Sequence, residues 1–310
     1  MTKTRLLWPV FVGFLFGTLV YALGFFAKTT LGRWCFKLFP ENGLFLLSFI
    51  VLAIVSLIIL MLNHIPKKWQ IRLTFILLLG GLGIFFDYFS LQYGFIAEKL
   101  PYLLKVGLLN TLWVSALSIV IACFIGFIAA IARLSTHGFW VGLSTFYISF
   151  FRGTPLLLQV FLIYQGLPQI GIILDAGLAG VIALSMGYGA YMAEIFRAGI
   201  EGVARGQREA AIALGLSRGQ TLCRIILPQA LRLTIPPIGN QFLSMLKDSS
   251  LVSIMGIWEL MFLARTQGRA EFKHLEMLIT AAIIYWVVSL VLEIGQSWLE
   301  RRFKSNLSKL

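Results

Sequence analysis

Residues Val106–Ala132 read VGLLNTLWVSALSIVIACFIGFIAAIA, a run of apolar and small side chains that contains no charged residue. A helix needs about 20 such residues to cross the hydrocarbon core of a bilayer. Arg133 follows directly, and cations are favoured at the water-facing ends of membrane helices. The stretch therefore predicts a transmembrane helix, and it sets the fold class that the rest of the chain has to fit.

Similar runs lie on both sides of this stretch. The chain has 310 residues, of which 59% are hydrophobic and only 13% charged, a composition outside the range of soluble domains. We predict an all-α polytopic membrane protein with eight crossings, three before Pro101 and five after it. The other expected spans are Leu6–Ala27, Leu44–Leu62, Leu73–Ile96, Leu156–Ile173, Ala176–Ala193, Ile225–Leu246 and Met277–Leu292.

Two of these segments need comment. Leu6–Ala27 follows a basic start, as in a signal peptide, but it lacks a small-residue cleavage pattern, so we expect a retained span. Val141–Phe151 is too short to cross, and Thr154-Pro155 follows it, so we expect an interfacial helix that breaks there. One long kinked helix is the alternative.

The placement of lysine and arginine predicts the orientation. With the N-terminus inside, inner segments carry seventeen of these residues and outer segments nine. Positive residues concentrate on the cytoplasmic side, so both termini are expected inside. The composition shift near Asp87–Pro101 predicts a boundary between an N-terminal membrane extension, 1–100, and a core, 101–310.

The sequence gives no sign of catalytic chemistry. It has no GxxxxGK[ST] phosphate-binding loop, and its three cysteines and three histidines are scattered. We therefore expect neither a metal site nor a cofactor in this chain, and no enzyme activity of its own. Any energy source has to come from another subunit.

The stretch 205–228 is the longest polar passage of the second half, and it contains QREAAIALGLSRGQTLCRIILP at Gln207–Pro228. Gly215 can adopt the left-handed conformation that ends a helix. Ser217 and Gln220 have the spacing of a capping box for a second helix. Pro228 has no amide hydrogen, so we expect a kink or a break there. The pattern predicts two short helices that meet at a glycine and face the cytoplasm.

The spacing of this stretch resembles the EAA loop of ATP-binding-cassette (ABC) importer permeases. Glu209-Ala210-Ala211, Gly215, Ile225 and Leu227-Pro228 fill every fixed position of that pattern. Four further segments resemble the permease subunits of polar amino-acid importers, over roughly Leu103–Leu299. They are FRGTPLLLQVFLIYQGLP (Phe151–Pro168), GYGAYMAEIFRAGIEGV (Gly187–Val203), GQREAA (Gly206–Ala211) and LKDSSLVSIMG (Leu246–Gly256).

The resemblance implies a five-helix permease core, extended here by about three N-terminal helices, in a bacterial inner membrane. It implies a cytosolic ATPase dimer, carrying ATP and Mg²⁺, that binds the hairpin. It also implies a second permease, identical or similar, and an external solute-binding protein that delivers a polar amino acid. The residues implied in ATPase coupling are Glu209, Ala210, Ala211, Gly215, Ile225, Leu227 and Pro228.

The residues of a substrate route are a hypothesis from the sequence. Lys247-Asp248 follows an apolar span, and ionisable groups at membrane depth are candidates for function. We expect them to line the route together with Asn240, Ser249 and Ser250; the alternative is a Lys–Asp pair that only fixes helix ends. Glu194 and Arg197 are one helical turn apart, which favours a structural pair. Arg152 and Thr154 are candidates for an inner gate or for helix capping.

Two other function classes remain open at this point. A secondary transporter or channel would act alone, but such proteins carry ionisable residues inside several spans, and few are found here. A membrane-embedded structural or regulatory subunit would give no reason for the spacing of the hairpin.

Overall fold

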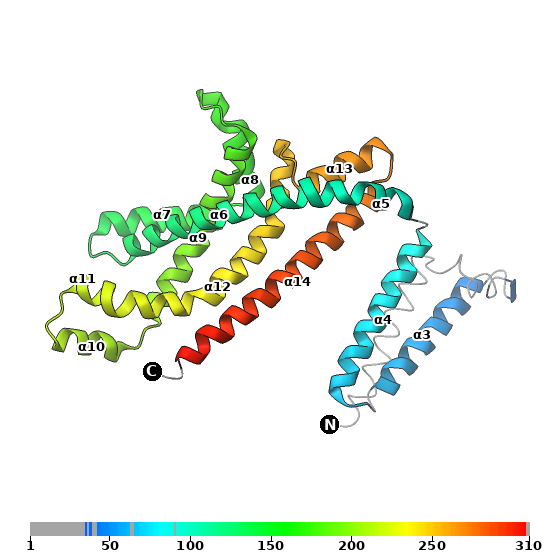
Figure 1. Ribbon diagram of the computed structural model, residues 1–310, viewed down its shortest axis with the longest axis horizontal. Coiled ribbons are helices and arrows are strands. Elements are labelled where there is room, and N and C mark those ends of the chain that lie inside the picture. The colour runs from blue at the N-terminus through cyan, green and yellow to red at the C-terminus, as the bar shows by residue number, and fades with distance from the viewer. Residues whose placement is uncertain (1–34, 36, 39–41, 63–64, 90, 308–310) are drawn as a thin grey trace. The chain divides into compact units, whose positions relative to one another are not determined.

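The computed structural model describes residues 35–307, except 36, 39–41, 63–64 and 90 (Figure 1). Every element in this part of the chain is a helix, which confirms the all-α fold class. The expected first span, Leu6–Ala27, lies outside the described residues. The chain divides into two compact units, with the boundary after Gln92.

The first unit contains two described helices, α3 (Gly43–Leu62) and α4 (Lys67–Tyr88). Their large apolar side chains, Phe49 and Leu78 among them, are mostly exposed. Apolar exposure of this kind is what a hydrocarbon environment stabilises. The expected span Leu73–Ile96 is wrong in its second half, because α4 ends at Tyr88 and a new helix begins at Tyr93.

The second unit opens with one long helix. α5 (Tyr93–Tyr102) continues through a π-helical turn, η1 (Leu103–Leu108), into α6 (Leu109–Arg133). The whole helix, Tyr93–Arg133, is 41 residues long and apolar enough to cross a membrane. Pro101 lies inside it, two residues before the π-helical turn.

The next two helices form a bent pair. α7 (Gly138–Gly153) and the segment Leu156–Ile170 meet at an angle of 106°, with Thr154 and Pro155 at the break. The extended backbone of both residues explains the bend, since the residue before a proline avoids the helical region. The expected break is confirmed, and one long kinked helix is excluded. Leu156–Ile170 comprises α8 (Leu156–Phe161), the π-helical turn η2 (Leu162–Gly166) and the 3₁₀ turn η3 (Leu167–Ile170).

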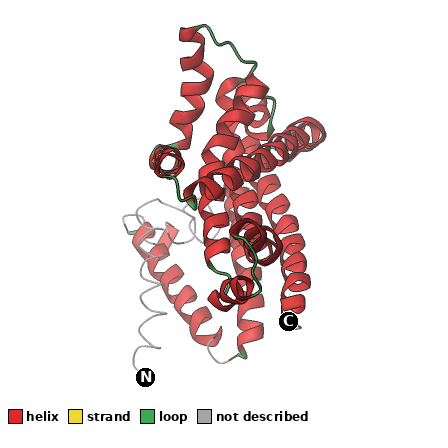
Figure 2. Ribbon diagram, turned by 90° about the vertical axis from the view of Figure 1, so that its left-hand side faces the viewer, coloured by secondary structure: helices red, strands yellow, loops and turns green. Residues whose placement is uncertain are grey.

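The remaining elements are helices and short helical turns, and they include the polar hairpin and the last long helix (Figures 1 and 2). Among the described residues, Ala176–Glu201 and His274–Arg301 are also long and apolar enough to cross a membrane, and the bent pair is a fourth candidate if it counts as one span. These elements are α9 (Ala176–Glu201), α10 (Arg205–Ala213), α11 (Arg218–Gln220), the π-helical turn η4 (Thr221–Ile226), α12 (Leu227–Asp248), the 3₁₀ turn η5 (Ser249–Met255), α13 (Leu260–Ala270) and α14 (His274–Leu307).

The core of the second unit lies between α6 and α9. A Cβ atom added at Gly126 of α6 would come within 2.4 Å of the Met192 Cβ and 2.8 Å of the Ala193 amide nitrogen on α9. Only glycine allows this approach, in the manner of small residues at membrane helix interfaces. Side-chain hydroxyls also satisfy backbone groups across the interface, because Ser185 of α9 donates to the Ser118 carbonyl of α6 over 3.2 Å.

Candidate functional site

The corner of the polar hairpin is built as the sequence predicts. Gly215 has a φ of +74°, the left-handed conformation that glycine adopts without steric cost. Its amide donates to the Ile212 carbonyl, and the Leu216 amide reaches back to the Ala211 carbonyl, which closes α10. Ser217 then caps α11 in a complete capping box with Gln220. Both expected caps are confirmed.

The second arm of the hairpin differs from the expectation. α11 runs without a break through η4 into α12, so the two arms are one short helix and one long one. The expected break at Pro228 is wrong, because Pro228 lies within this continuous helix, at the start of α12. The π-helical turn η4 lies directly before it, and such turns occur as local irregularities inside α-helices.

The first arm presents its motif residues unequally. Glu209 and Ala210 are exposed, whereas Ala211 is buried. No hydrogen bond or ion pair of the described chain involves the Glu209 carboxylate. Its neighbour Arg208, in contrast, donates a hydrogen bond to the Ile200 carbonyl over 2.9 Å, which anchors α10 to the end of α9. Glu209 is thus an unpartnered anion on a well-anchored helix.

Other motif positions hold the hairpin onto the membrane helices. Ile225 and Leu227 pack against a buried cluster formed by Ile200, Val203, Ile226 and Ala230. Gln229 of α12 also donates to Gln207 of α10 over 3.2 Å. A displacement of the hairpin would therefore be transmitted to α9 and α12.

Two exposed apolar side chains on the hairpin were not anticipated from the sequence. Ile212 is 68% exposed and Leu214 is 79% exposed. Both lie between Ala211 and Gly215, the fixed positions of the motif. The signal was present as apolar letters within a polar passage, but only the folded hairpin shows that they face away from the chain.

The charged residues at the end of α9 form a network that we call the Glu194 cluster: Arg133, Arg152, Glu194, Arg197 and Glu201. Glu194 accepts hydrogen bonds from Arg133 of α6 and, at 2.7 Å, from Arg197. Arg197 also pairs with Glu201 at 2.6 Å, and Arg152 of α7 lies 3.9 Å from Glu194. The expected Glu194–Arg197 pair is confirmed, and it proves to join three helices rather than one turn.

Asp248 lies in a polar cavity of about 220 Å³ between α7, α8, α9 and α12. Its carboxylate accepts a hydrogen bond from the Tyr188 hydroxyl at 2.7 Å. Thr154 lines the same cavity, where its hydroxyl accepts from the Gln159 amide at 3.0 Å. Sequence reasoning missed Tyr188 and Gln159. The other lining residues are Phe151, Leu156, Gly187, Tyr191, Gln241 and Ser244.

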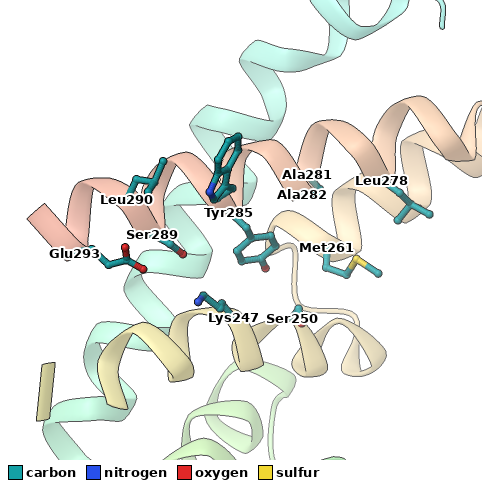
Figure 3. Close-up of a pocket in the computed structure, with 11 residues that line it drawn as sticks. Lys247, Ser250, Met261, Leu278, Ala281, Ala282, Tyr285, Ser289, Leu290 and Glu293 are labelled. Carbon is teal, nitrogen blue, oxygen red and sulfur yellow. The ribbon is translucent and has the colours of Figure 1, made fainter. Parts of the chain in front are cut away.

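Lys247 lines a different cavity, of about 570 Å³, together with Ser250 (Figure 3). In this view Lys247 lies opposite α14, where Ser289 and Glu293 face the cavity. Within the residues that the structure describes, neither Lys247 nor Asp248 belongs to an ion pair. The expected joint lining by Lys247 and Asp248 is thus split between two cavities, because adjacent residues on α12 point to different sides of the helix.

The two remaining candidates of the substrate route have structural partners. Asn240 accepts from the Gln296 amide of α14 at 2.9 Å. Ser249 is buried and donates to the Leu246 carbonyl at the end of α12. Neither residue lines the two cavities just described.

Glu259 is a buried carboxylate in the loop between α12 and α14. It caps α13 by accepting from the amides of Met261 and Phe262, and it accepts from the Tyr285 hydroxyl at 2.9 Å. Burial is the largest influence on this group and raises its pKa to about 7, although these hydrogen bonds and the charge of Arg265 oppose the shift. Over the described chain, no group of three or more His, Cys, Asp or Glu residues could hold a metal ion.

Comparison with known proteins places this arrangement in a family. Residues 122–305 match the model described as "Binding-protein-dependent transport system inner membrane component". The arginine transport system permease protein ArtQ of Bacillus subtilis is 38% identical over 218 residues, which are 70% of this chain and 99% of ArtQ. The glutamine transport system permease protein GlnP of Escherichia coli K12 is 38% identical over 206 residues, 65% of this chain and 93% of GlnP.

A solved structure shares the fold of about two thirds of the chain. A chain from the crystal structure of an amino acid ABC transporter with histidines superposes with a TM-score of 0.65 and is 36% identical. The match covers 68% of this chain and 99% of that one. The chain is a multi-pass membrane protein that belongs to the family of inner membrane components of binding-protein-dependent transport systems.

Proposed function

We propose that this chain is the permease subunit of an ATP-driven importer of polar amino acids. The observation that carries the proposal is the hairpin, which holds an unpartnered Glu209 on an anchored helix within the EAA spacing. Two permease proteins of amino-acid transport systems are each 38% identical to this chain over about two thirds of its length, and a chain of a solved amino acid ABC transporter superposes on it with a TM-score of 0.65.

The mechanism follows from how the hairpin is attached. A cytosolic ATPase dimer, which carries ATP and Mg²⁺, binds the exposed face of α10. Its movement passes through the packing of Ile225 and Leu227 to α9 and α12. The Glu194 cluster ties α9 to α6 and α7, so these helices move together and open the route alternately to each side. A second permease, identical or similar, completes the pair.

The proposed topology has eight crossings and both termini on the cytoplasmic side of a bacterial inner membrane. It puts the hairpin inside and the α13 region outside, where an external binding protein delivers the amino acid. Asp248, Tyr188 and Thr154 line one part of the substrate route, and Lys247 with Ser250 lines another. Arg152 lies near the inner end of that route.

The coupling is tested with the permease reconstituted together with its ATPase and binding protein. Glu209→Arg reverses the charge on the free face of α10, and we expect loss of ATPase co-purification and of ATP-dependent uptake. Glu271→Arg is the matched control for ATPase co-purification alone, because Glu271 is an exposed carboxylate directly after α13, on the other side of the membrane from the hairpin in the proposed topology. Intact complex and uptake in Glu209→Arg would defeat the proposal. Uptake driven by an ion gradient without ATPase would support the secondary-transporter alternative.

The substrate route is tested separately. Asp248→Asn removes the negative charge of the acceptor in the polar cavity, and Tyr188→Phe removes the hydroxyl donor. We expect both variants to lower uptake while ATPase binding persists. Normal uptake in both variants would remove this cavity from the route.

A further inference from the structure

A third cavity lies between η2, η5, α13 and the start of α14, and its volume is about 880 Å³. Figure 1 shows α13 at the opposite end of the second unit from α10. Three basic side chains line this cavity, and no acidic one does. We call it the arginine cavity; its lining residues are Phe161, Tyr164, Ser253, Ile254, Met255, Gly256, Met261, Phe262, Arg265, Thr266, Arg269, His274 and Leu278.

The two arginines of the cavity are neighbours on one helix face. Arg265 and Arg269 are four residues apart on α13, which places them one turn apart on the same side. Both are exposed, and neither donates a hydrogen bond or forms an ion pair within the described residues. His274 adds a third basic group from the first turn of α14.

The buried carboxylate of Glu259 does not neutralise the two arginines of this cavity. Glu259 is the acid that the charge of Arg265 affects, but its side chain is fully buried. Its oxygens already accept from two backbone amides and from the Tyr285 hydroxyl. The guanidinium groups of the cavity therefore keep their donors available for a ligand.

The location makes these charges unusual. In the topology proposed above, the segment between α12 and α14 lies outside, and outer segments of this length are normally poor in lysine and arginine. The segment nevertheless retains Arg265, Arg269 and Lys273. Since orientation alone favours their absence, a binding role gives a reason for their presence.

We infer that the arginine cavity binds the carboxylate group of a free amino acid on the outer side of the permease. Planar guanidinium groups match a carboxylate in a forked hydrogen-bonding geometry. Phe161, Tyr164 and Phe262 supply an aromatic wall for the rest of the molecule. The inference rests on the proposed function and deepens it, because it adds an anion-binding site apart from the cavity of Asp248.

The test measures protection of arginines from a chemical reagent. The complete permease–ATPase complex in lipid nanodiscs, without binding protein or nucleotide, is treated with phenylglyoxal, and modification of each arginine is followed by mass spectrometry. L-Glutamine is one probe and L-glutaminamide, which lacks the carboxylate, is the other. We expect glutamine to slow modification of Arg265 and Arg269 by 1 + [L]/Kd, about threefold at twice the Kd. Glutaminamide should not, and Arg72 of α4, which is exposed and lies outside the hairpin and the cavity, is the internal control.

Variants provide a second readout. Arg265→Gln with Arg269→Gln should raise the KM for uptake several-fold with kcat retained, whereas Lys273→Gln removes the same charge from a residue off the cavity wall and should leave KM unchanged. Equal protection by glutaminamide, no protection at all, or protection only after the binding protein is added would each overturn the inference. ATP-dependent uptake by the unmodified chain tests the proposed function, so uptake without arginine protection would reject the cavity site alone.

Discussion

The hairpin and the α6–α9 interface make opposite use of small residues. At the interface, Gly126 lies where an added Cβ would meet Met192 at 2.4 Å, so its small size serves packing within the chain. On the hairpin, Gly215 has open space where a Cβ would be and serves its left-handed backbone conformation instead, whereas Ala210 is exposed and serves neither packing nor backbone conformation. The difference teaches that a motif residue whose type is needed neither for packing nor for backbone conformation within the chain is the one to assign to contact with a partner.

The largest loss of stability is expected from a substitution of Gly126 in the α6–α9 interface. We expect Gly126→Leu to force α6 and α9 apart and to destabilise the fold by more than about 3 kcal/mol, because overpacking at a backbone contact has no flexible side chain to move. Size-exclusion profiles and thermal unfolding in detergent measure this loss. Gly142→Leu is the control, since a Cβ at Gly142 of α7 meets nothing within 4 Å. Equal stability of both variants would contradict the tight interface.

The buried carboxylate of Glu259 makes the stability of the fold depend on pH. Its folded pKa of about 7 lies above the ordinary value of 4.5, so the folded state binds a proton more tightly than the unfolded state. Stability is therefore highest below about pH 4.5 and falls, by up to about 3 kcal/mol, as pH rises through 7. We expect this fall between pH 5 and 8 in thermal unfolding, and we expect it to be absent in Glu259→Gln. A fall of the same size in the variant would rule out Glu259 as its source.

Variants of the Glu194 cluster test whether ion pairs also stabilise the packing of α6, α7 and α9. Glu194→Gln weakens the contacts with Arg133 and Arg197, and we expect a loss of about 1–2 kcal/mol, reduced because the side chains are partly exposed. Glu201→Gln is matched and should cost only about 0.3–0.5 kcal/mol, since it removes one exposed pair on a single helix. Denaturation in detergent compares the two. A smaller loss in Glu194→Gln would show that the cluster does not join the helices.

The smallest change in stability is expected on the hairpin. Leu214 is 79% exposed, so Leu214→Ser should alter stability by less than about 0.5 kcal/mol. The same change should weaken ATPase binding about tenfold, because it removes an apolar contact that only a partner can cover. Ile173→Ser, at a residue 83% exposed outside the hairpin, is the control. Unchanged ATPase binding in Leu214→Ser would leave its exposure without a function.

Local rules explain which elements were predictable. The bend at Thr154-Pro155, the left-handed Gly215 and the capping box of Ser217 each depend on a few neighbouring residues, so the sequence predicts them and the structure confirms them. Pro228 shows the limit of the same reasoning. The sequence predicts a break there, but the helix runs on through η4 into α12, and no local pattern reveals the π-helical turn directly before the proline.

The sequence by itself determined that this chain is a helical membrane protein with an importer-type hairpin. Hydrophobic length and motif spacing are properties of the covalent chain, so they need no knowledge of packing. Tertiary structure alone decided which side chains meet: that Lys247 and Asp248 line separate cavities, that Glu194 joins α6, α7 and α9, and that Arg265 and Arg269 share a cavity with His274. Such contacts depend on the rotation and crossing of helices far apart in sequence, which no local pattern encodes.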